Sequence, residues 1–252
     1  MYKKTVLLFL LYISQNIIGQ SNINRYNTIQ LENFQLNEKY NFWLLISENS
    51  LHQSIDIPVI LLKGKHDGPV IGITAAIHGD EINGTAITHS LLDQIDVSKL
   101  SGTIIAFPVL NPQGFLLNQR DDIYNTDLNR IFPGKANGTE SEQFVWALKE
   151  KILPKLNFLI DIHTASFGRV NTMYVRSNLQ NDTLAHMAKL FQPDIILDSR
   201  EASAGIITSA SKTLRQEATD RGIHCITLEA GDPLIIQKNM TNRGSEGHVR
   251  IL

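Results

Sequence analysis

Runs of apolar residues that end in polar ones recur along this chain. The clearest run, residues 70–77 (VIGITAAI), follows Gly-Pro and precedes His-Gly, which is typical of a buried strand. Apolar residues then recur at helical spacing from Ile82 to Leu91, so the chain turns from strand to helix at 78–81. Later apolar strands are predicted over 103–110, 158–162, 173–176, 195–197 and 223–228, with helices over 139–153, 184–191 and 207–221. This alternation predicts an α/β fold of three layers, α/β/α, around a mixed, largely parallel sheet.

The residues before this alternation predict two further features. Segments 40–47 and 55–63 read as paired strands, so we expect an opening β-hairpin at about 40–63, with Pro58 at a sheet edge. Lys3 and Lys4 precede the apolar run 6–13, which is the layout of a secretory signal peptide over residues 1–20. The alternative is that this run forms a buried N-terminal strand.

The signal peptide predicts where the protein works. We expect removal of residues 1–20 to leave one domain, residues 21–252, that is exported either to a periplasm or out of the cell. The apolar run 6–13 is too short to span a bilayer, so we expect no stable membrane insertion after the signal is removed.

The composition narrows the class of protein and of partner. A chain of 252 residues, 42% hydrophobic and 19% charged, suits one globular domain. Its net charge is −2 with no cluster of Lys and Arg, which argues against a nucleic-acid partner. The single cysteine, Cys225, lies in an apolar run and is expected in the core. The sequence leaves the oligomeric state open.

Residues able to bind a metal follow three of the predicted strands. His78 and Glu81 follow the first, His163 follows 158–162, and Glu229 follows 223–228. In open α/β sheets, ligands bind at this edge. An isolated His-x-x-Glu pair is more often a histidine in a turn, next to a glutamate that stabilises the N-terminus of a helix. Four such residues at strand ends, however, favour a catalytic zinc, which takes three His and carboxylate ligands and leaves a position for water.

Two more regions are expected near this group. Asp161 and His163 are two apart on a strand and therefore share a face, so Asp161, with the adjacent Thr164, is expected to support His163 or to line the pocket. Residues 115–138 show no periodicity and are rich in Asn, Asp and Arg. A loop of this length within a compact domain is often functional.

Taken together, these motifs resemble the succinylglutamate desuccinylase/aspartoacylase family of the zinc carboxypeptidase superfamily. The resemblance covers roughly residues 57–247 in the family's order. The matching elements are His-Gly-Asp-Glu at 78–81, Asn-Pro at 111–112 with Gly114, Arg120, Asp-Leu-Asn-Arg at 127–130 with Phe-Pro-Gly at 132–134, Asp-Ile-His-Thr at 161–164, and Glu-Ala-Gly at 229–231.

The resemblance implies a zinc carboxypeptidase-like fold and one Zn²⁺ per chain, held by His78, Glu81 and His163. Glu229 corresponds to the general base and acid. These roles agree with elementary chemistry, because zinc makes water acidic and a nearby carboxylate can move its proton.

The resemblance also assigns roles to residues of the polar loop 115–138. Arg120 corresponds to the arginine that polarises the scissile carbonyl, and Asn129 with Arg130 to the residues that hold a substrate carboxylate. A guanidinium matches a carboxylate with two parallel hydrogen bonds, which an ammonium group cannot do.

The function that follows is a zinc-dependent hydrolase of an amide, or of an ester, in a small N-acyl amino-acid-like substrate that bears a carboxylate. An alternative enzyme is a metallocarboxypeptidase acting on peptides or cell-wall stem peptides. Family members usually continue through a helix, here resembled by 245–252, into a smaller β-rich domain that covers the site, so we expect that C-terminal cap to be missing. A third alternative is therefore an inactive or non-catalytic binding module.

Overall fold

A computed structural model describes residues 24–199 and 212–251. Within these residues, nine strands form a single sheet in the order β1-β2-β3-β5-β4-β6-β9-β7-β8. The strands are β1 Asn24–Tyr26, β2 Glu38–Glu48, β3 Ser54–Lys63, β4 His66–Ala75, β5 Ser101–Phe107, β6 Phe158–His163, β7 Tyr174–Ser177, β8 Ile195–Asp198 and β9 His224–Glu229. Neighbours from β5 through β9 in the centre are parallel, whereas β2–β3, β3–β5 and β9–β7 are antiparallel. The predicted mixed, largely parallel sheet is confirmed.

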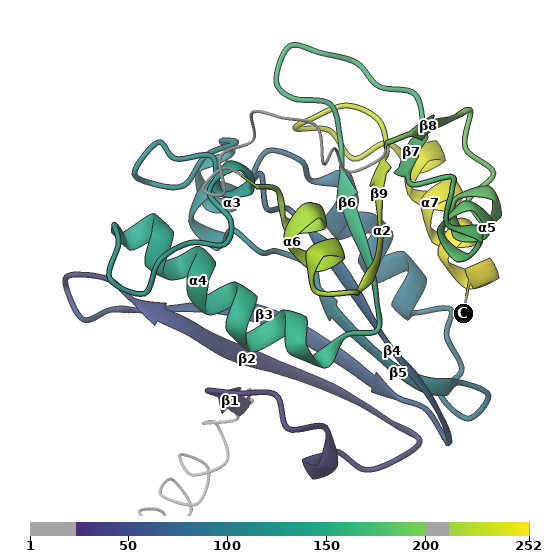
Figure 1. Cartoon of the computed structure of the whole chain (residues 1–252), viewed down its shortest axis with the longest axis horizontal. Helices are drawn as coiled ribbons and strands as arrows, with labels where there is room; N and C mark the ends of the chain where they lie inside the picture. Colours follow the sequence, from purple (N-terminus) through teal and green to yellow (C-terminus); the bar gives the residue numbers. More distant parts are fainter. Residues whose placement is uncertain (1–23, 200–211, 252) are drawn as a thin grey trace, which may run out of the picture.

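Helices cover both faces of the sheet (Figure 1). The α-helices are α2 Asn83–Leu92, α3 Pro112–Leu117, α4 Glu140–Ile152, α5 Asp182–Leu190, α6 Leu214–Asp220 and α7 Lys238–Ile251, and the 3-10 helices are η1 Leu31–Asn33, η2 Leu128–Arg130 and η3 Leu153–Lys155. One core cluster joins the sheet to α4 and α6. A second joins it to α2, α5 and α7, which gives the three layers that the sequence predicts. None of the described helices combines the length and apolar character needed to cross a membrane.

Strand β6 shows how alternation places the site. Leu159 packs in the cluster beneath α4 and α6, whereas Ile160 and Ile162 pack in the cluster on the opposite face. Side chains two apart on a strand share a face, so Asp161 and His163 point to the same side as Leu159. Both faces of this strand are buried, as expected for a central parallel strand.

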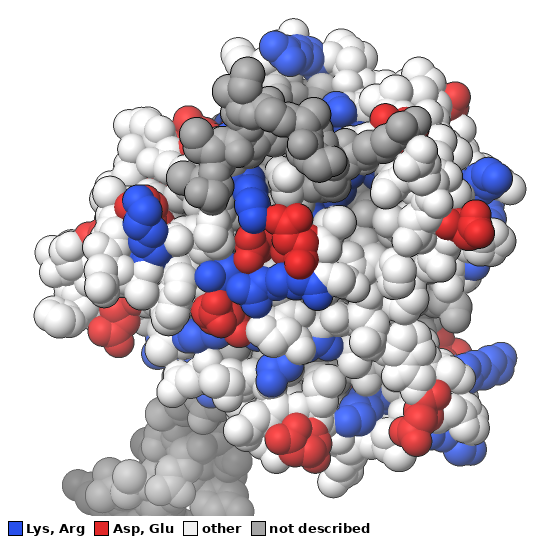
Figure 2. All heavy atoms as spheres, viewed as in Figure 1, with Lys and Arg blue, Asp and Glu red and all other residues white. Residues whose placement is uncertain are grey.

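The charged surface over α4 and α6 consists of paired side chains. Lys212 Nζ lies 2.6 Å from Asp220, and Arg221 lies 2.9 Å from Glu217 and 3.3 Å from Glu150. Figure 2 shows charged side chains of both signs gathered over these two helices. Acids and bases on this surface therefore largely neutralise one another.

The hairpin of β2 and β3 is present, but the prediction that Pro58 lies on an edge strand was wrong. Strand β3 has β2 on one side and β5 on the other. Its pairing with β5 covers only Ile60–Lys63, so Pro58 lies beyond that pairing and faces only β2 in the ladder. A proline is tolerated there because no second strand needs its missing N–H.

Several predicted boundaries also differ from the structure. Strand β4 ends at Ala75 rather than at 77, because Ala76 has a left-handed φ of 49°. Helix α6 begins at Leu214, where Thr213 Oγ1 accepts a hydrogen bond from the Gln216 amide and caps the helix. Helix α7 begins at Lys238 rather than at 245, since its first turns are polar and showed no apolar spacing. Residues 207–211 and the predicted signal peptide lie outside the described residues, so export stays a prediction.

Candidate active site

His78, Glu81 and His163 converge on one point. Glu81 Oε1 lies 2.8 Å from His78 Nδ1, and Glu81 Oε2 lies 2.8 Å from His163 Nδ1. The two Nδ1 atoms are 3.2 Å apart, and all three side chains are buried. His163 is the last residue of β6, while His78 and Glu81 lie in the turn between β4 and α2.

Gly79 explains why that turn can bring His78 and Glu81 together. Its backbone packs directly on the backbone of Gly114, and a Cβ added at Gly79 would lie 2.0 Å from the Gly114 carbonyl carbon. The Gly79 amide also donates to the Arg120 carbonyl at 3.3 Å. The turn is therefore fixed against the loop that carries Arg120, and any side chain at Gly79 would force the two segments apart.

The second nitrogen of each imidazole faces a carboxylate. His163 Nε2 lies 2.9 Å from Asp161 Oδ2, and His78 Nε2 lies 3.2 Å from Asp127 Oδ1. A carboxylate accepts hydrogen bonds, so these contacts favour protonated Nε2 atoms. A metal ion bound between the rings would then be coordinated by the Nδ1 lone pairs, beside Glu81. The arrangement fits the two-histidine, one-carboxylate set of a catalytic zinc.

The electrostatics of this group favour a bound cation. Burial raises the pKa of Glu81, but His163 and His78 outweigh burial and bring it down to about 2. Burial lowers the pKa of His163, but Asp161 and Glu81 outweigh that effect and place it well above its usual value. The carboxylates of Glu81, Asp161 and Asp127 thus favour positive charge at the two rings, and a divalent cation between the Nδ1 atoms could supply it.

Arg120 closes one side of the group. Its Nε and Nη2 donate to Asp127 Oδ2 at 3.1 and 2.9 Å, while Nη1 donates to Glu81 Oε1 and Ser166 Oγ, both at 3.2 Å. Burial raises the pKa of Asp127, but His78 and Arg120 hold it well below its usual range. Asp127 thus links the ring of His78 to Arg120, a role that the sequence did not single out although its motif included the residue.

Glu229 lies beside His163 on the neighbouring strand. It is the last residue of β9 and pairs in register with His163. Asn171 Nδ2 donates to Glu229 Oε2 at 3.2 Å, and Arg176 Nε lies 3.5 Å from Glu229 Oε1. Burial raises the pKa of Glu229, with a further contribution from Glu81. A carboxyl with a raised pKa is a better proton acceptor, as a general base requires.

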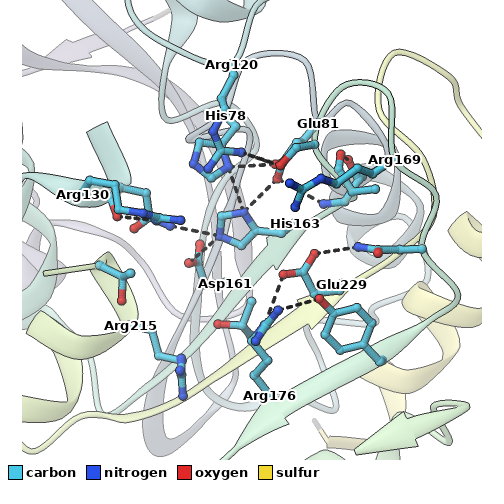
Figure 3. Close-up of a pocket in the computed structure, with 18 residues that line it drawn as sticks. His78, Glu81, Arg120, Arg130, Asp161, His163, Arg169, Arg176, Arg215 and Glu229 are labelled. Carbon is cyan, nitrogen blue, oxygen red and sulfur yellow. Dashed lines mark hydrogen bonds and ion pairs between the residues drawn. The ribbon is translucent and has the colours of Figure 1, made fainter. Parts of the chain in front are cut away.

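All nine residues predicted for the site line one cavity of about 360 Å³ (Figure 3), namely His78, Glu81, Arg120, Asn129, Arg130, Asp161, His163, Thr164 and Glu229. The Thr164 amide donates to Glu81 Oε2 at 3.1 Å, and Asp161 Oδ1 accepts from Thr74 at 2.7 Å. The Asn129 amide oxygen accepts from the Leu214 amide at 2.7 Å, so Asn129 also fixes the start of α6. Arg130 Nη1 donates to the Asn129 carbonyl at 2.9 Å.

Three arginines of this cavity were not predicted: Arg169, Arg176 and Arg215. Arg176 lies on β7 beside Tyr174, whose hydroxyl accepts from Arg176 Nη2 at 2.8 Å. Arg215 Nη2 donates to Ser199 Oγ at 2.8 Å. No sequence motif includes these residues. The one indication in the sequence was a basic residue close to the end of a predicted strand. Their place in the cavity depends on how the chain returns after β6, which the sequence did not reveal.

Comparison with known proteins identifies relatives of this chain. The sequence model of the succinylglutamate desuccinylase/aspartoacylase catalytic domain matches residues 67–252. The chain is 25% identical over 119 residues to the N-alpha-acetyl-L-2,4-diaminobutyric acid deacetylase of Halomonas elongata, a match that covers 47% of this chain and 34% of that protein. The chain therefore matches about a third of the length of this curated relative.

Solved structures show the same fold. The product-bound ectoine utilization protein EutE (DoeB) from Ruegeria pomeroyi superposes with a TM-score of 0.73 at 22% identity, covering 87% of this chain and 68% of that one. A succinylglutamate desuccinylase/aspartoacylase from Rhodobacter sphaeroides also gives 0.73, at 20% identity, covering 90% and 68% of the two chains. Because the family model matches about three quarters of the sequence, the chain belongs to the succinylglutamate desuccinylase/aspartoacylase family.

Proposed function

We propose that this protein is a zinc-dependent hydrolase that cleaves the amide bond of a small N-acyl amino acid. The observation that carries the proposal is the buried group of His78, Glu81 and His163, with Glu229 beside it on the adjacent strand. The deacetylase activity named for the Halomonas relative, and the enzymes for which the family is named, support amide hydrolysis of this kind.

The metal-binding residues would hold one Zn²⁺ through two imidazole nitrogens and one carboxylate. When bound, zinc supplies a Lewis acid that makes water more acidic and draws electrons from a carbonyl. Asp161 and Asp127 keep the two rings oriented, with their Nε2 atoms facing carboxylates and their Nδ1 atoms turned toward Glu81, where the three groups could coordinate one ion. The turn at Gly79 holds His78 and Glu81 in place before any substrate arrives.

Glu229 would move the proton of the reaction. Its carboxylate accepts a proton from the attacking water and delivers it to the amide nitrogen as the carbon–nitrogen bond breaks, which yields a carboxylate and an amine. Asn171 and Arg176 orient the two carboxylate oxygens. Arg120 would stabilise the negative charge that develops on the carbonyl oxygen, because Glu81 and Asp127 hold its guanidinium at the wall of the cavity.

Arg130 would hold the carboxylate of the amino-acid part of the substrate. Its guanidinium lines the cavity and, among residues 24–199 and 212–251, forms a hydrogen bond with the Asn129 carbonyl only, so the rest of its fork is available to a ligand. A cavity of about 360 Å³ lies at the small end of the usual range for ligand sites, which suits an acyl amino acid better than a long peptide.

The test combines elemental analysis with a substrate panel. Purified chain loaded with zinc and dialysed should retain one zinc per chain and release amino acid from N-acyl amino acids faster than from dipeptides and tripeptides. Stoichiometric zinc with turnover of peptides alone would favour the carboxypeptidase alternative. Absence of both zinc and turnover would leave the binding-module alternative and contradict the proposal.

A further inference from the structure

Tyr174 and Arg176 project from β7 toward the end of β9. In the antiparallel pairing of these two strands, Tyr174 lies opposite Glu229 and Arg176 lies opposite Thr227. Residues two apart on a strand share a face, and residues opposite one another on paired strands share it as well. All four side chains accordingly line the cavity. Strand β7 therefore brings a phenol and a guanidinium beside the Glu229 carboxylate.

Arg176 joins Tyr174 to Glu229. Its Nε lies 3.5 Å from Glu229 Oε1, and its Nη2 donates to the Tyr174 hydroxyl at 2.8 Å. The guanidinium carbon also lies 5.1 Å from the centre of the Tyr174 ring, where a cation is attracted to the face of an aromatic ring. Figure 3 shows Arg176 and Glu229 pointing toward one another. Tyr174 thus fixes the guanidinium that faces the carboxylate.

The Glu229 carboxylate is restrained at both of its oxygens. Asn171 Nδ2 donates to Oε2 at 3.2 Å, on the side away from the Arg176 contact with Oε1. The Asn171 amide in turn donates to Asp232 Oδ1 at 3.2 Å, which fixes the loop that carries Asn171. The last torsion of a glutamate side chain is broad, so a carboxylate held at one oxygen alone can still rotate. Contacts at both oxygens remove that freedom.

The contacts of Arg176 distinguish it from an arginine that binds substrate. Recognition of a carboxylate uses two parallel N–H groups of the guanidinium fork. In Arg176 the edge formed by Nε and Nη2 already faces Glu229 and Tyr174. Burial raises the pKa of Tyr174, and the Glu229 carboxylate raises it further, so the phenol keeps its proton. Arg176 is therefore engaged within the chain, beside the residue that moves the proton.

We propose that Tyr174 and Arg176 form a positioning pair that holds Glu229 in the orientation from which it delivers a proton to the leaving amine. This inference rests on the proposed function, which assigns proton transfer to Glu229. In that step the proton that Glu229 took from water passes to the amide nitrogen as the carbon–nitrogen bond breaks, and the electron pair of the bond stays on the nitrogen. Misplacement of such a group by about 1 Å can cost about 100-fold in rate.

The experiment compares two substrates with the same acyl group, using zinc-loaded full-length chain. An N-acetyl amino acid needs a proton on its leaving nitrogen, whereas 4-nitrophenyl acetate releases a stable phenolate that needs none. We expect Arg176→Gln to lower kcat for the amide by about 10- to 100-fold, within the usual contribution of general acid–base catalysis. Its KM for the amide, and kcat for the ester, should change by less than about two-fold.

Further variants show whether Tyr174 acts through Arg176. Tyr174→Phe removes only the hydroxyl and should lower kcat for the amide by a smaller factor. The double variant should lose no more than Arg176→Gln alone, since residues that act as a unit are not additive. Arg176→Lys should recover part of kcat, because a charge remains beside Glu229 without the fork. Arg243→Gln is the matched control: it removes an arginine paired with Asp194 at 2.8 Å outside the cavity lining, and kcat should not change.

The outcomes separate this inference from the proposed function. Equal losses with amide and ester would overturn the positioning role and leave the hydrolase intact. A raised KM with unchanged kcat in Arg176→Gln would show that Arg176 binds substrate, which also overturns it. Additive losses in the double variant would overturn the pair on the amide alone. If the unaltered chain cleaves no N-acyl amino acid, the proposed function fails and this inference fails with it.

Discussion

The charged surface over α4 and α6 and the charged cavity at the end of the sheet contain similar acidic and basic side chains. The two regions differ in how many of these side chains form ion pairs. On the surface, Lys212 and Arg221 each lie within 3 Å of a carboxylate, at 2.6 Å from Asp220 and 2.9 Å from Glu217. In the cavity, two buried imidazoles crowd around one carboxylate, while Arg130 and Arg169 have none within ion-pair distance among the described residues. Among the described residues, the surface completes its own ion pairing, whereas the cavity does not.

This difference separates structural charge from functional charge. Surface ion pairs contribute little to stability because water screens them and the side chains lose freedom. Charges that remain unpaired around a cavity are arranged for a group that is not part of the chain. Substitutions in the two regions should therefore have effects of very different size.

The largest effect should come from His163→Ala, which removes one of three metal-binding groups. We expect this variant to lose stoichiometric zinc and all measurable turnover, with elemental analysis after dialysis as the measurement. His186→Ala, on the exposed side of α5, is the control and should keep one zinc per chain. Retention of stoichiometric zinc with unchanged affinity in His163→Ala would refute the assigned ligand set.

Next in size is Glu229→Gln, which keeps the shape of the side chain but cannot accept a proton. We expect kcat to fall by roughly 10²–10⁴-fold, the usual contribution of general acid–base catalysis, with zinc content and thermal stability unchanged. Steady-state kinetics with parallel metal analysis measures both. Full activity in this variant would remove Glu229 from the mechanism even if the zinc site were correct.

A smaller effect is expected from Arg130→Ala at one end of the cavity. Loss of one charge-assisted contact should raise KM for substrates with a free amino-acid carboxylate by about 10- to 100-fold and change kcat little. The methyl esters of the same substrates provide the control, since they have no charge at that position. Equal impairment of acids and esters would contradict the anchoring role.

The smallest effect belongs to the surface region. Asp220→Asn removes the exposed partner of Lys212 and should lower the free energy of unfolding by about 0–1 kcal/mol, as for other exposed ion pairs. Denaturant unfolding measures this change, and turnover should equal that of the unaltered chain. A loss of activity similar to that of Arg130→Ala would remove the distinction between the two regions.

The sequence predicted what depends on local pattern. The buried strands were visible because both of their faces are apolar, as Leu159 and Ile160 illustrate on β6. His78, Glu81 and His163 could be named because they follow such strands and match a family motif. Asp161 could be placed near His163 because of the strand period alone.

The features that escaped prediction depend on the path of the chain in three dimensions. Pro58 lies on an inner strand, β3, and is tolerated there because β5 pairs with only the second half of that strand. Arg169 and Arg176 reach the cavity because the segment after β6 turns back over the strand ends, and nothing local in the sequence reveals that turn. The contact of Asn129 with the start of α6 joins residues 85 positions apart, so no motif could have indicated it.

The position of Glu81 and His163 on different segments has a consequence for the order of folding events. Their side chains meet although 82 residues separate them, and they do so only when β6 has paired with β4. Contacts of such sequence separation form late because closing the intervening loop costs entropy. Zinc affinity should therefore develop only in the last stage of refolding, after helical circular dichroism has recovered. Because zinc at this site would bind the native chain more tightly than the unfolded one, its concentration would also shift the unfolding equilibrium by mass action.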